Sequence, residues 1–170
     1  MFIGHLGLSY LISQAPRAWG KKLSIKEVIF LLVVGYILDL DLFITGLAGV
    51  NHHYLGVHTP VSAFYLGLLL YFLLRGRISK TALFLVFPVL LGHLVLDDIA
   101  YWFHILGWQA WSQFPQINWL YPFAVQGATD FSQLNFLEII RFYIIKAPVN
   151  AFLEVILVLL ALFVFSSRKK

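Results

Sequence analysis

Cysteine is absent from the 170 residues, and charged residues make up only 12% of them. The first absence excludes disulfides and thiolate metal sites, so any bound metal would need histidine or carboxylate ligands. The second absence separates the chain from ordinary soluble domains, which carry about 25% charged residues. With 61% hydrophobic residues and a mean hydropathy of +0.85, the chain has the composition of a membrane protein.

The sequence contains long apolar runs. Four of them approach or exceed the roughly 20 helical residues that a bilayer requires. They cover residues 25–50, 59–74, 81–106 and 147–165, and a shorter run covers residues 2–15. The positive charges follow this first run, which is the reverse of an export signal. The pattern predicts one domain, residues 1–170, with an all-α fold: a polytopic membrane bundle of about four transmembrane helices and a short, half-spanning N-terminal helix.

The connection between the third and fourth runs, residues 107–146, is rich in amphipathic aromatic residues. These are Trp108, Trp111, Trp119, Tyr121 and Tyr143. Tryptophan and tyrosine favour the headgroup layer, because one end of the ring is apolar and the other forms hydrogen bonds. We therefore expect an interfacial, aromatic-rich connection on the membrane surface.

The basic residues gather in three places, residues 17–26, 75–80 and 168–170. With four crossings, all three clusters fall on one side, which the positive-inside rule identifies as the cytoplasm. We expect an integral membrane protein with a cytoplasmic C-terminus and membrane lipid as its partner. The formal charge of +4 is explained by these clusters, so we expect no nucleic-acid partner. The sequence leaves the oligomeric state open.

Ionisable residues lie at one common depth when residues are counted outward from the basic clusters. Lys26 to Asp39 and Lys80 to His93 are equal intervals, each roughly 20 Å of helix at about 1.5 Å per residue. Similar counts bring three further segments to this level, through His5, His58 and Glu154. Five segments therefore converge on one site in the outer part of the membrane.

Two of these segments contain recognisable local patterns. In "GHLVLDD", His93 and Asp97 are four residues apart, so they lie on one helical face and can hold one cation between them. In "HHYLGVHTP", Thr59 and Pro60 are suited to the cap and first turn of a helix, which places His58 at the start of the second span.

Two carboxylates leave alternatives open. Asp39 and Asp41 in "LDLD" would point to nearly opposite faces of a regular helix, so either one is a ligand or the helix unwinds there. Asp98 is rotated by about 100° from Asp97 and faces a neighbouring segment or the surface.

The simplest alternative to a site is that each polar group hydrogen-bonds a neighbouring helix. A charged group in the membrane centre costs about 2.5 to 3.5 kcal/mol, and no Lys or Arg lies at the matching depth. A divalent cation would compensate Asp39, Asp41 and Asp97. Four other ionisable residues we assign to the interface or surface: His52, His104, Asp130 and Glu138.

The order of "GHLGL", "LDLD", "HHYLGVHTP", "GHLVLDD" and "WLYPF" resembles the LexA-regulated, membrane-bound metal-dependent hydrolase family. The resemblance covers most of the chain up to Phe123, and the His-x-x-x-Asp helix is also similar to that of zinc-dependent phospholipases C. Leu38 stands where the family motif has proline, and Tyr54 where it has arginine. The resemblance implies a prokaryotic cytoplasmic (inner) membrane. It implies metal ligands drawn from His5, Asp39, Asp41, His53, His58, His93 and Asp97.

Seven ligands exceed the three or four that one zinc takes, so they fit two ions that share a carboxylate. Zinc is the first expectation, and mixed imidazole and carboxylate ligation also admits manganese, iron or nickel. His52 is the alternative to His53. The expected function is metal-dependent hydrolysis of a phospholipid or lipid-linked ester, with a phosphodiester favoured and Asp98 or Glu154 as the base.

A non-catalytic metal-binding protein and a metal or proton transporter are the alternatives. A transporter would continue its polar residues toward the cytoplasmic ends of the spans. Those halves, "VIFLLVVG" and "ALFLVFPVLL", are apolar, which favours a one-sided site.

Overall fold

The computed structural model describes residues 3–40, 58–108, 115, 117–123, 141, 145 and 148–167. All the secondary-structure elements assigned within these residues are helices, which confirms the predicted all-α fold class. In chain order, the elements are α1 (Gly4–Gln14), η1 (Ala15–Trp19), α2 (Ile25–Tyr36), η2 (Leu38–Leu40), α4 (Pro60–Leu74), α5 (Lys80–Asp97), α6 (Ile99–Ile105) and α8 (Pro148–Ser166), where η denotes a short 3-10 helix.

Side-chain caps explain where two of the helices begin. The Ser24 hydroxyl accepts the N–H of Glu27, whose carboxylate accepts the N–H of Ser24, and this capping box starts α2. Thr59 and Ser62 form the same arrangement at α4, with Pro60 in the first turn. The predicted helix start at Thr59 and Pro60 is therefore confirmed.

Two apolar runs are not continuous helices. The run predicted over residues 25–50 forms α2 and then tightens into η2, while residues 41–50 lie outside the described part. The run over residues 81–106 is divided at Asp98 into α5 and α6. The last carbonyl groups of a helix have no intrahelical partner, so the end of α2 at Tyr36 leaves acceptors for side chains of other helices.

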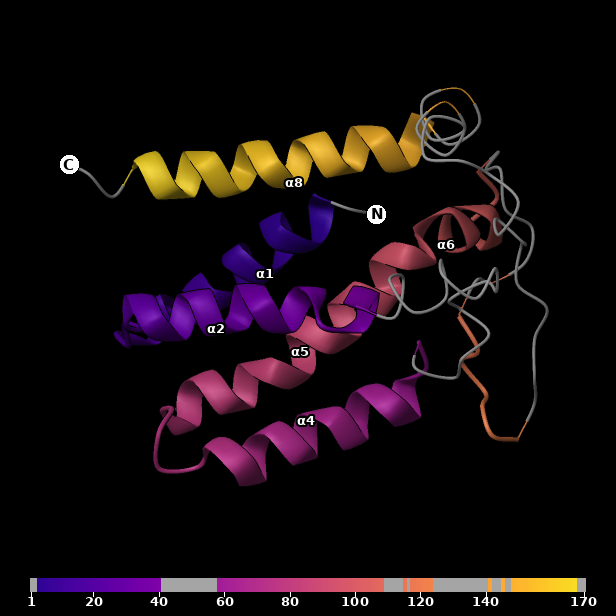
Figure 1. The fold of residues 1–170 in the computed structure, drawn as a ribbon. Helices are drawn as coiled ribbons and strands as arrows, with labels where there is room; N and C mark the ends of the chain where they lie inside the picture. Colours follow the sequence, from indigo (N-terminus) through magenta and orange to yellow (C-terminus); the bar gives the residue numbers. More distant parts are fainter. Residues whose placement is uncertain are drawn as a thin grey trace.

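The short helix α1 lies within the bundle, between α8 on one side and α2 on the other (Figure 1). It also contacts α5. Small residues allow these close approaches. A Cβ atom added to Gly7 would lie 2.9 Å from the backbone of Leu157 in α8, and one added to Gly35 would lie 2.0 Å from the Ser9 hydroxyl oxygen.

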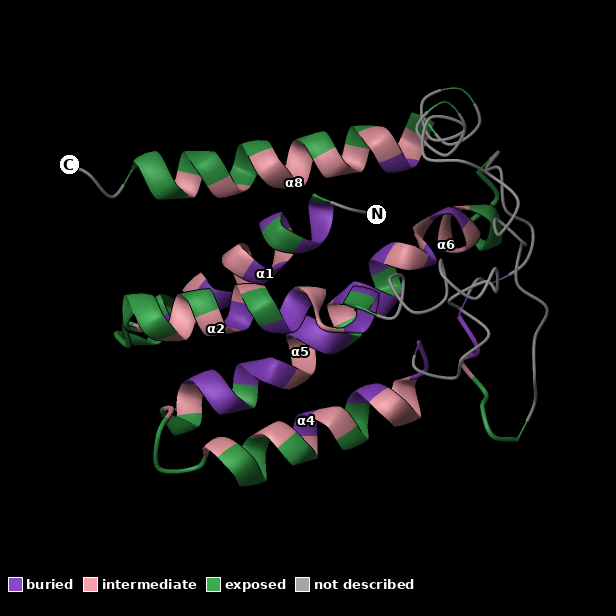
Figure 2. Cartoon of the chain, in the orientation of Figure 1, coloured by how far each residue is buried: buried purple, intermediate pink, exposed green. Residues whose placement is uncertain are grey.

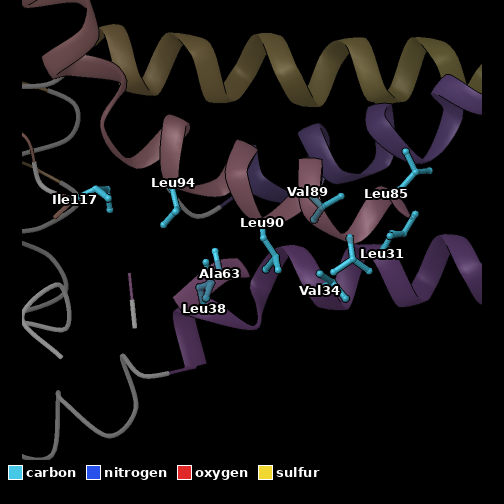
Figure 3. Close-up of a cluster of buried hydrophobic side chains, with 10 residues drawn as sticks. Leu31, Val34, Leu38, Ala63, Leu85, Val89, Leu90, Leu94 and Ile117 are labelled. Atoms are coloured by element: carbon cyan, nitrogen blue, oxygen red, sulfur yellow. The ribbon is translucent and has the colours of Figure 1, made fainter. Parts of the chain in front are cut away.

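The hydrophobic core is centred on α5, which packs against α2 and α4 (Figure 3). Its buried side chains are Leu31, Val34, Leu38, Ala63, Leu85, Val86, Val89, Leu90, Leu94 and Ile117. Ile117 comes from the connection after α6, so part of that connection is packed into the core at the end of α5.

Among the described residues, α5 and α8 are long and apolar enough to cross a membrane, and α4 is a shorter apolar helix. In α5, 50% of the apolar window is buried inside the molecule, whereas in α8 the share is only 6%. Figure 2 shows α8 as a mixture of exposed and half-buried residues along its length. Because α8 presents apolar side chains to its surroundings, lipid is a better medium for it than water.

The basic segments lie at one end of the bundle. Glu27 Oε1 accepts the N–H of Ser79 at 3.0 Å, which joins the start of α2 to the start of α5. The connections at residues 17–26 and 75–80 therefore lie close together, and α8 finishes at the same end (Figure 1). η2 and the start of α4 lie at the opposite end.

Candidate metal centre

Five of the predicted site residues meet at the end of the bundle opposite the basic segments. They are His5 of α1, Asp39 of η2, His58 directly before the cap of α4, and His93 and Asp97 of α5. The exposed fraction of His5, His58 and His93 is at most 1%. Side chains from four of the five segments that were predicted to converge are thus in contact with one another.

Asp39 is the central carboxylate, because all three histidines approach it. Its Oδ1 lies 3.5 Å from Nε2 of His93 and 3.7 Å from Nε2 of His58. Its Oδ2 lies 3.8 Å from Nδ1 of His5. Among the described residues, every ion-pair partner of Asp39 is a histidine, so neither lysine nor arginine compensates it there.

Asp97 forms the second acidic group of the cluster. Its Oδ2 lies 3.2 Å from Nε2 of His93, one helical turn away, as the spacing predicted. Its Oδ1 lies 3.3 Å from Nε2 of His5. The rings of His5 and His93 are stacked with their centroids 3.8 Å apart, so α1 and α5 are joined directly at the site.

Backbone carbonyls determine which nitrogen of two rings carries a proton. His93 Nδ1 lies 2.8 Å from the carbonyl oxygen of Gly35, and His5 Nε2 lies 3.3 Å from the carbonyl oxygen of His93. A carbonyl can only accept, so these two nitrogens donate. The other nitrogen of each ring faces Asp39, and neither it nor Asp39 Oδ2 has a hydrogen-bond partner.

With both rings neutral, that arrangement is unfavourable unless a cation is present. A neutral ring nitrogen with a lone pair and a carboxylate oxygen are both acceptors, and burying them face to face costs free energy. A metal ion between them would bind both, and histidine ligands in metal sites usually donate their other N–H to a carbonyl or carboxylate. The residues present therefore fit a divalent metal.

The chemistry of the donor set agrees with this fit. One potential ligand atom from each of Asp39, His58, His93 and Asp97 lies within 4.8 Å of the others. Two imidazoles and two carboxylates could hold a metal ion, and such a set suits zinc, manganese, iron or nickel. His5 lies beside these four groups and extends the cluster toward α1.

Two members of the predicted ligand set, Asp41 and His53, lie outside the described residues, as does the alternative His52. Asp39 of "LDLD" lies in the cluster. It does so because α2 has already ended and Asp39 sits in the tighter 3-10 turn.

The two predicted bases have different surroundings. Asp98 is buried, and its oxygens accept the N–H of Ile117 at 3.3 Å and the indole N–H of Trp119. Glu154 of α8 is half-buried and accepts the N–H of Ile3, two residues before His5, at 3.0 Å. Asp98 therefore adjoins the cluster residue Asp97 in the chain, and Glu154 contacts the start of the helix that carries His5. Their catalytic roles remain predictions.

Sequence reasoning did not identify Gly35, whose carbonyl orients His93, because a glycine near a helix end has many structural explanations. It also assigned Trp119 to the membrane interface, whereas the indole N–H bonds to Asp98. The only local signal for this contact was the second aspartate of "GHLVLDD". His104 is exposed on α6, as expected for a residue outside the site.

Searches for related proteins found no matching family model, no similar curated protein and no similar solved structure.

Proposed function

We propose that the protein is a membrane-bound, metal-dependent hydrolase that acts on a phospholipid or lipid-linked ester, with a phosphodiester as the favoured substrate. One observation carries the proposal: His5 and His93 donate one ring N–H each to a backbone carbonyl and direct the other nitrogen at Asp39. Orientation of this kind is characteristic of metal ligands. The resemblance to membrane-bound metal-dependent hydrolases in the sequence motifs supports the same conclusion.

Asp39, His58, His93 and Asp97 would hold the metal, with zinc as the first expectation. His5, together with Asp41 and His53, would supply ligands to a second ion. A bound divalent metal lowers the pKa of water toward about 7 and polarises a phosphoryl or acyl oxygen. The burial of the cluster excludes bulk water, which strengthens electrostatic interactions there.

Glu154 is the better of the two candidate bases. Asp98 accepts hydrogen bonds from a backbone N–H and an indole N–H of the connection after α6, so its carboxylate is directed at that connection. Glu154 Oε2 accepts the N–H of Ile3, two residues before the cluster residue His5. We propose that the Glu154 carboxylate accepts the proton released when water attacks the substrate.

The membrane part of the proposal is a bundle of four crossings in the cytoplasmic membrane of a prokaryote, with the basic end inside. It is supported by the two long apolar helices and by the basic connections at one end. The metal centre then lies near the outer headgroup level. A lipid whose ester bonds lie at that level is the natural substrate.

A metal or proton transporter is the alternative that uses the same polar groups. Against it, the buried residues of α5 between its start and His93 are all apolar. A transport path would need polar groups along that half of the bundle, and those that α1 buries there are the uncharged hydroxyls of Ser9 and Ser13.

The test combines metal analysis with a lipid assay on the protein purified in detergent. We expect a divalent metal to co-purify, and release of a headgroup or phosphate from mixed phospholipids that stops with chelator and returns with metal. Glu154→Gln should retain the metal but lower kcat by about 10² to 10⁴-fold, the usual contribution of a general base. Glu27→Gln, the same change at the opposite end of the bundle, is the control and should retain full activity.

Absence of any bound or titratable metal would reject the site itself. Metal binding without hydrolysis of any phospholipid or lipid-linked ester would favour the non-catalytic or transport alternative.

A further inference from the structure

Asp98 is a buried carboxylate at the junction of two helices. It follows the last residue of α5 and precedes the first residue of α6, and its exposed fraction is 1%. A residue at this place commonly caps the second helix, but the side chain of Asp98 forms no cap hydrogen bond. It instead accepts the N–H of Ile117 with both oxygens at 3.3 Å and the indole N–H of Trp119.

The segment that Asp98 binds is fixed on both sides of these hydrogen bonds. Ile117 is 1% exposed and belongs to the core, where it lies beyond Leu94 at the end of α5 (Figure 3). The Trp119 ring packs edge-on against Trp102 of α6, with centroids 5.5 Å apart. A buried carboxylate is costly unless it is hydrogen-bonded, so Asp98 and this segment depend on each other.

The residues that follow turn outward. Leu120, Tyr121 and Phe123 are 58%, 40% and 95% exposed. We call these three residues the apolar tip. The apolar tip thus begins directly after Trp119, whose indole N–H bonds to Asp98. Asp98 in turn follows the cluster residue Asp97 in the chain. Apolar side chains held at a membrane interface are buried at the boundary of the acyl chains, and ligand sites are lined mostly by apolar side chains.

We propose that Asp98 is a positioning residue, which holds residues 117–119 so that the apolar tip contacts the hydrocarbon part of the lipid beside the metal centre. This inference rests on the proposed function and assigns the lipid selectivity of the same site. Asp98 acts through Trp119 and Ile117, and it does not touch the reacting atoms. The bond cleaved is still determined by the metal cluster, while the tip selects substrates that carry acyl chains.

The test compares two substrates that differ in their apolar part, a long-chain phospholipid in mixed micelles and the water-soluble diester bis(4-nitrophenyl) phosphate. Asp98→Asn and Trp119→Phe should each raise KM for the phospholipid by about tenfold, as expected for loss of a hydrogen bond to a charged group. Both should leave the bound metal, and kcat and KM for the soluble diester, within about twofold of the wild type. The double variant should be no worse than either single variant, because both remove one contact.

Trp102→Phe is the matched control. It also replaces an indole by a phenyl ring in the same ring pair, but the N–H of Trp102 has no hydrogen-bond partner. It should leave the phospholipid KM near the wild-type value. An equal loss with both substrates in Asp98→Asn would make Asp98 part of the catalytic step, and loss of metal would make it part of the metal site; either result overturns the proposal.

A second readout does not depend on hydrolysis. The indole N–H resonance of Trp119, identified by its loss in Trp119→Phe, should shift in Asp98→Asn and stay in place in Glu27→Gln. An unchanged resonance in Asp98→Asn overturns the positioning role even if the enzyme is active. If the wild type hydrolyses neither substrate, the proposed function fails. The positioning role of Asp98 is then tested by the shift of this resonance and by lipid binding, and we expect Asp98→Asn to retain less long-chain lipid than the wild type.

Discussion

His93 combines three contacts that explain the candidate site at the scale of single residues. Its Nδ1 donates to Gly35, its Nε2 faces Asp39 and Asp97, and its ring stacks on His5. Loss of this side chain would remove one ligand and also release the ring of His5. Such a residue should behave as part of a unit, and its effect should not add to that of a fellow ligand.

We predict that His93→Ala and Asp97→Asn each abolish bound metal and any hydrolysis, while the protein still inserts into the membrane because the apolar residues of α5 drive insertion. The double variant should lose no more than either single variant. Elemental analysis of metal per protein measures this. His104→Ala is the control, since His104 is exposed on α6. Full metal in His93→Ala together with its loss in His104→Ala would show that the cluster has been assigned to the wrong residues.

At the scale of elements, the fully buried residues of α1 are small or polar, and its larger apolar residues are half-buried or exposed. Its buried residues are Gly4, His5, Gly7, Ser9 and Ser13, whereas Leu6 is 39% exposed. A soluble amphipathic helix would show the opposite arrangement. Helices that associate within lipid use small residues at their interfaces, because lipid supplies no hydrophobic force between apolar faces.

The closest of these approaches leads to a prediction about stability. Gly35→Ala would place a Cβ atom 2.0 Å from the Ser9 hydroxyl oxygen and 3.1 Å from the Ser9 Cβ. The hydroxyl must rotate away and α1 and α2 must shift slightly apart, at a cost of about 1 to 3 kcal/mol. The carbonyl that orients His93 would shift with α2, so metal affinity should fall as well. Thermal unfolding in detergent and a metal titration measure the two effects.

Two further variants test the cause. Ser9→Ala combined with Gly35→Ala should recover part of the loss, because the hydroxyl is removed while the Ser9 Cβ position at 3.1 Å remains close. Gly92→Ala is the control, since its nearest neighbour is the flexible end of the Leu8 side chain at 2.7 Å, which can move cheaply. If Gly35→Ala is no more harmful than Gly92→Ala, the α1 to α2 contact does not limit stability.

At the scale of the whole molecule, the bundle has one basic end and one His/Asp end. The buried side chains of α5 between these ends are apolar. The two ends of a membrane protein with this distribution should face different compartments, with the basic end in the cytoplasm.

The absence of cysteine makes this orientation directly measurable. Arg77→Cys lies in the turn between α4 and α5, and Leu106→Cys lies just after α6, where the wild-type side chain is 71% exposed. With an impermeant thiol reagent on intact cells, we expect labelling of Leu106→Cys alone, and labelling of Arg77→Cys only after permeabilisation. Equal labelling of both on intact cells would contradict the orientation.

The sequence by itself determined the helical class, the ligand chemistry and several local features. Two of these local features depend only on residues within one helical turn, and the structure contains both. They are the contact between His93 and Asp97, four residues apart, and the helix cap at Thr59 and Pro60. Residue counting also brought His5, Asp39 and His93 to one depth, because the helical rise is constant.

Contacts between distant segments were decided only by the tertiary structure. The end of α2 put Asp39 in a 3-10 turn beside His93 and left the Gly35 carbonyl for His93. The break at Asp98 turned its side chain toward Ile117 and Trp119. Neither result follows from a local pattern, because a hydrogen-bond partner 58 or 21 residues away is chosen by how the helices pack.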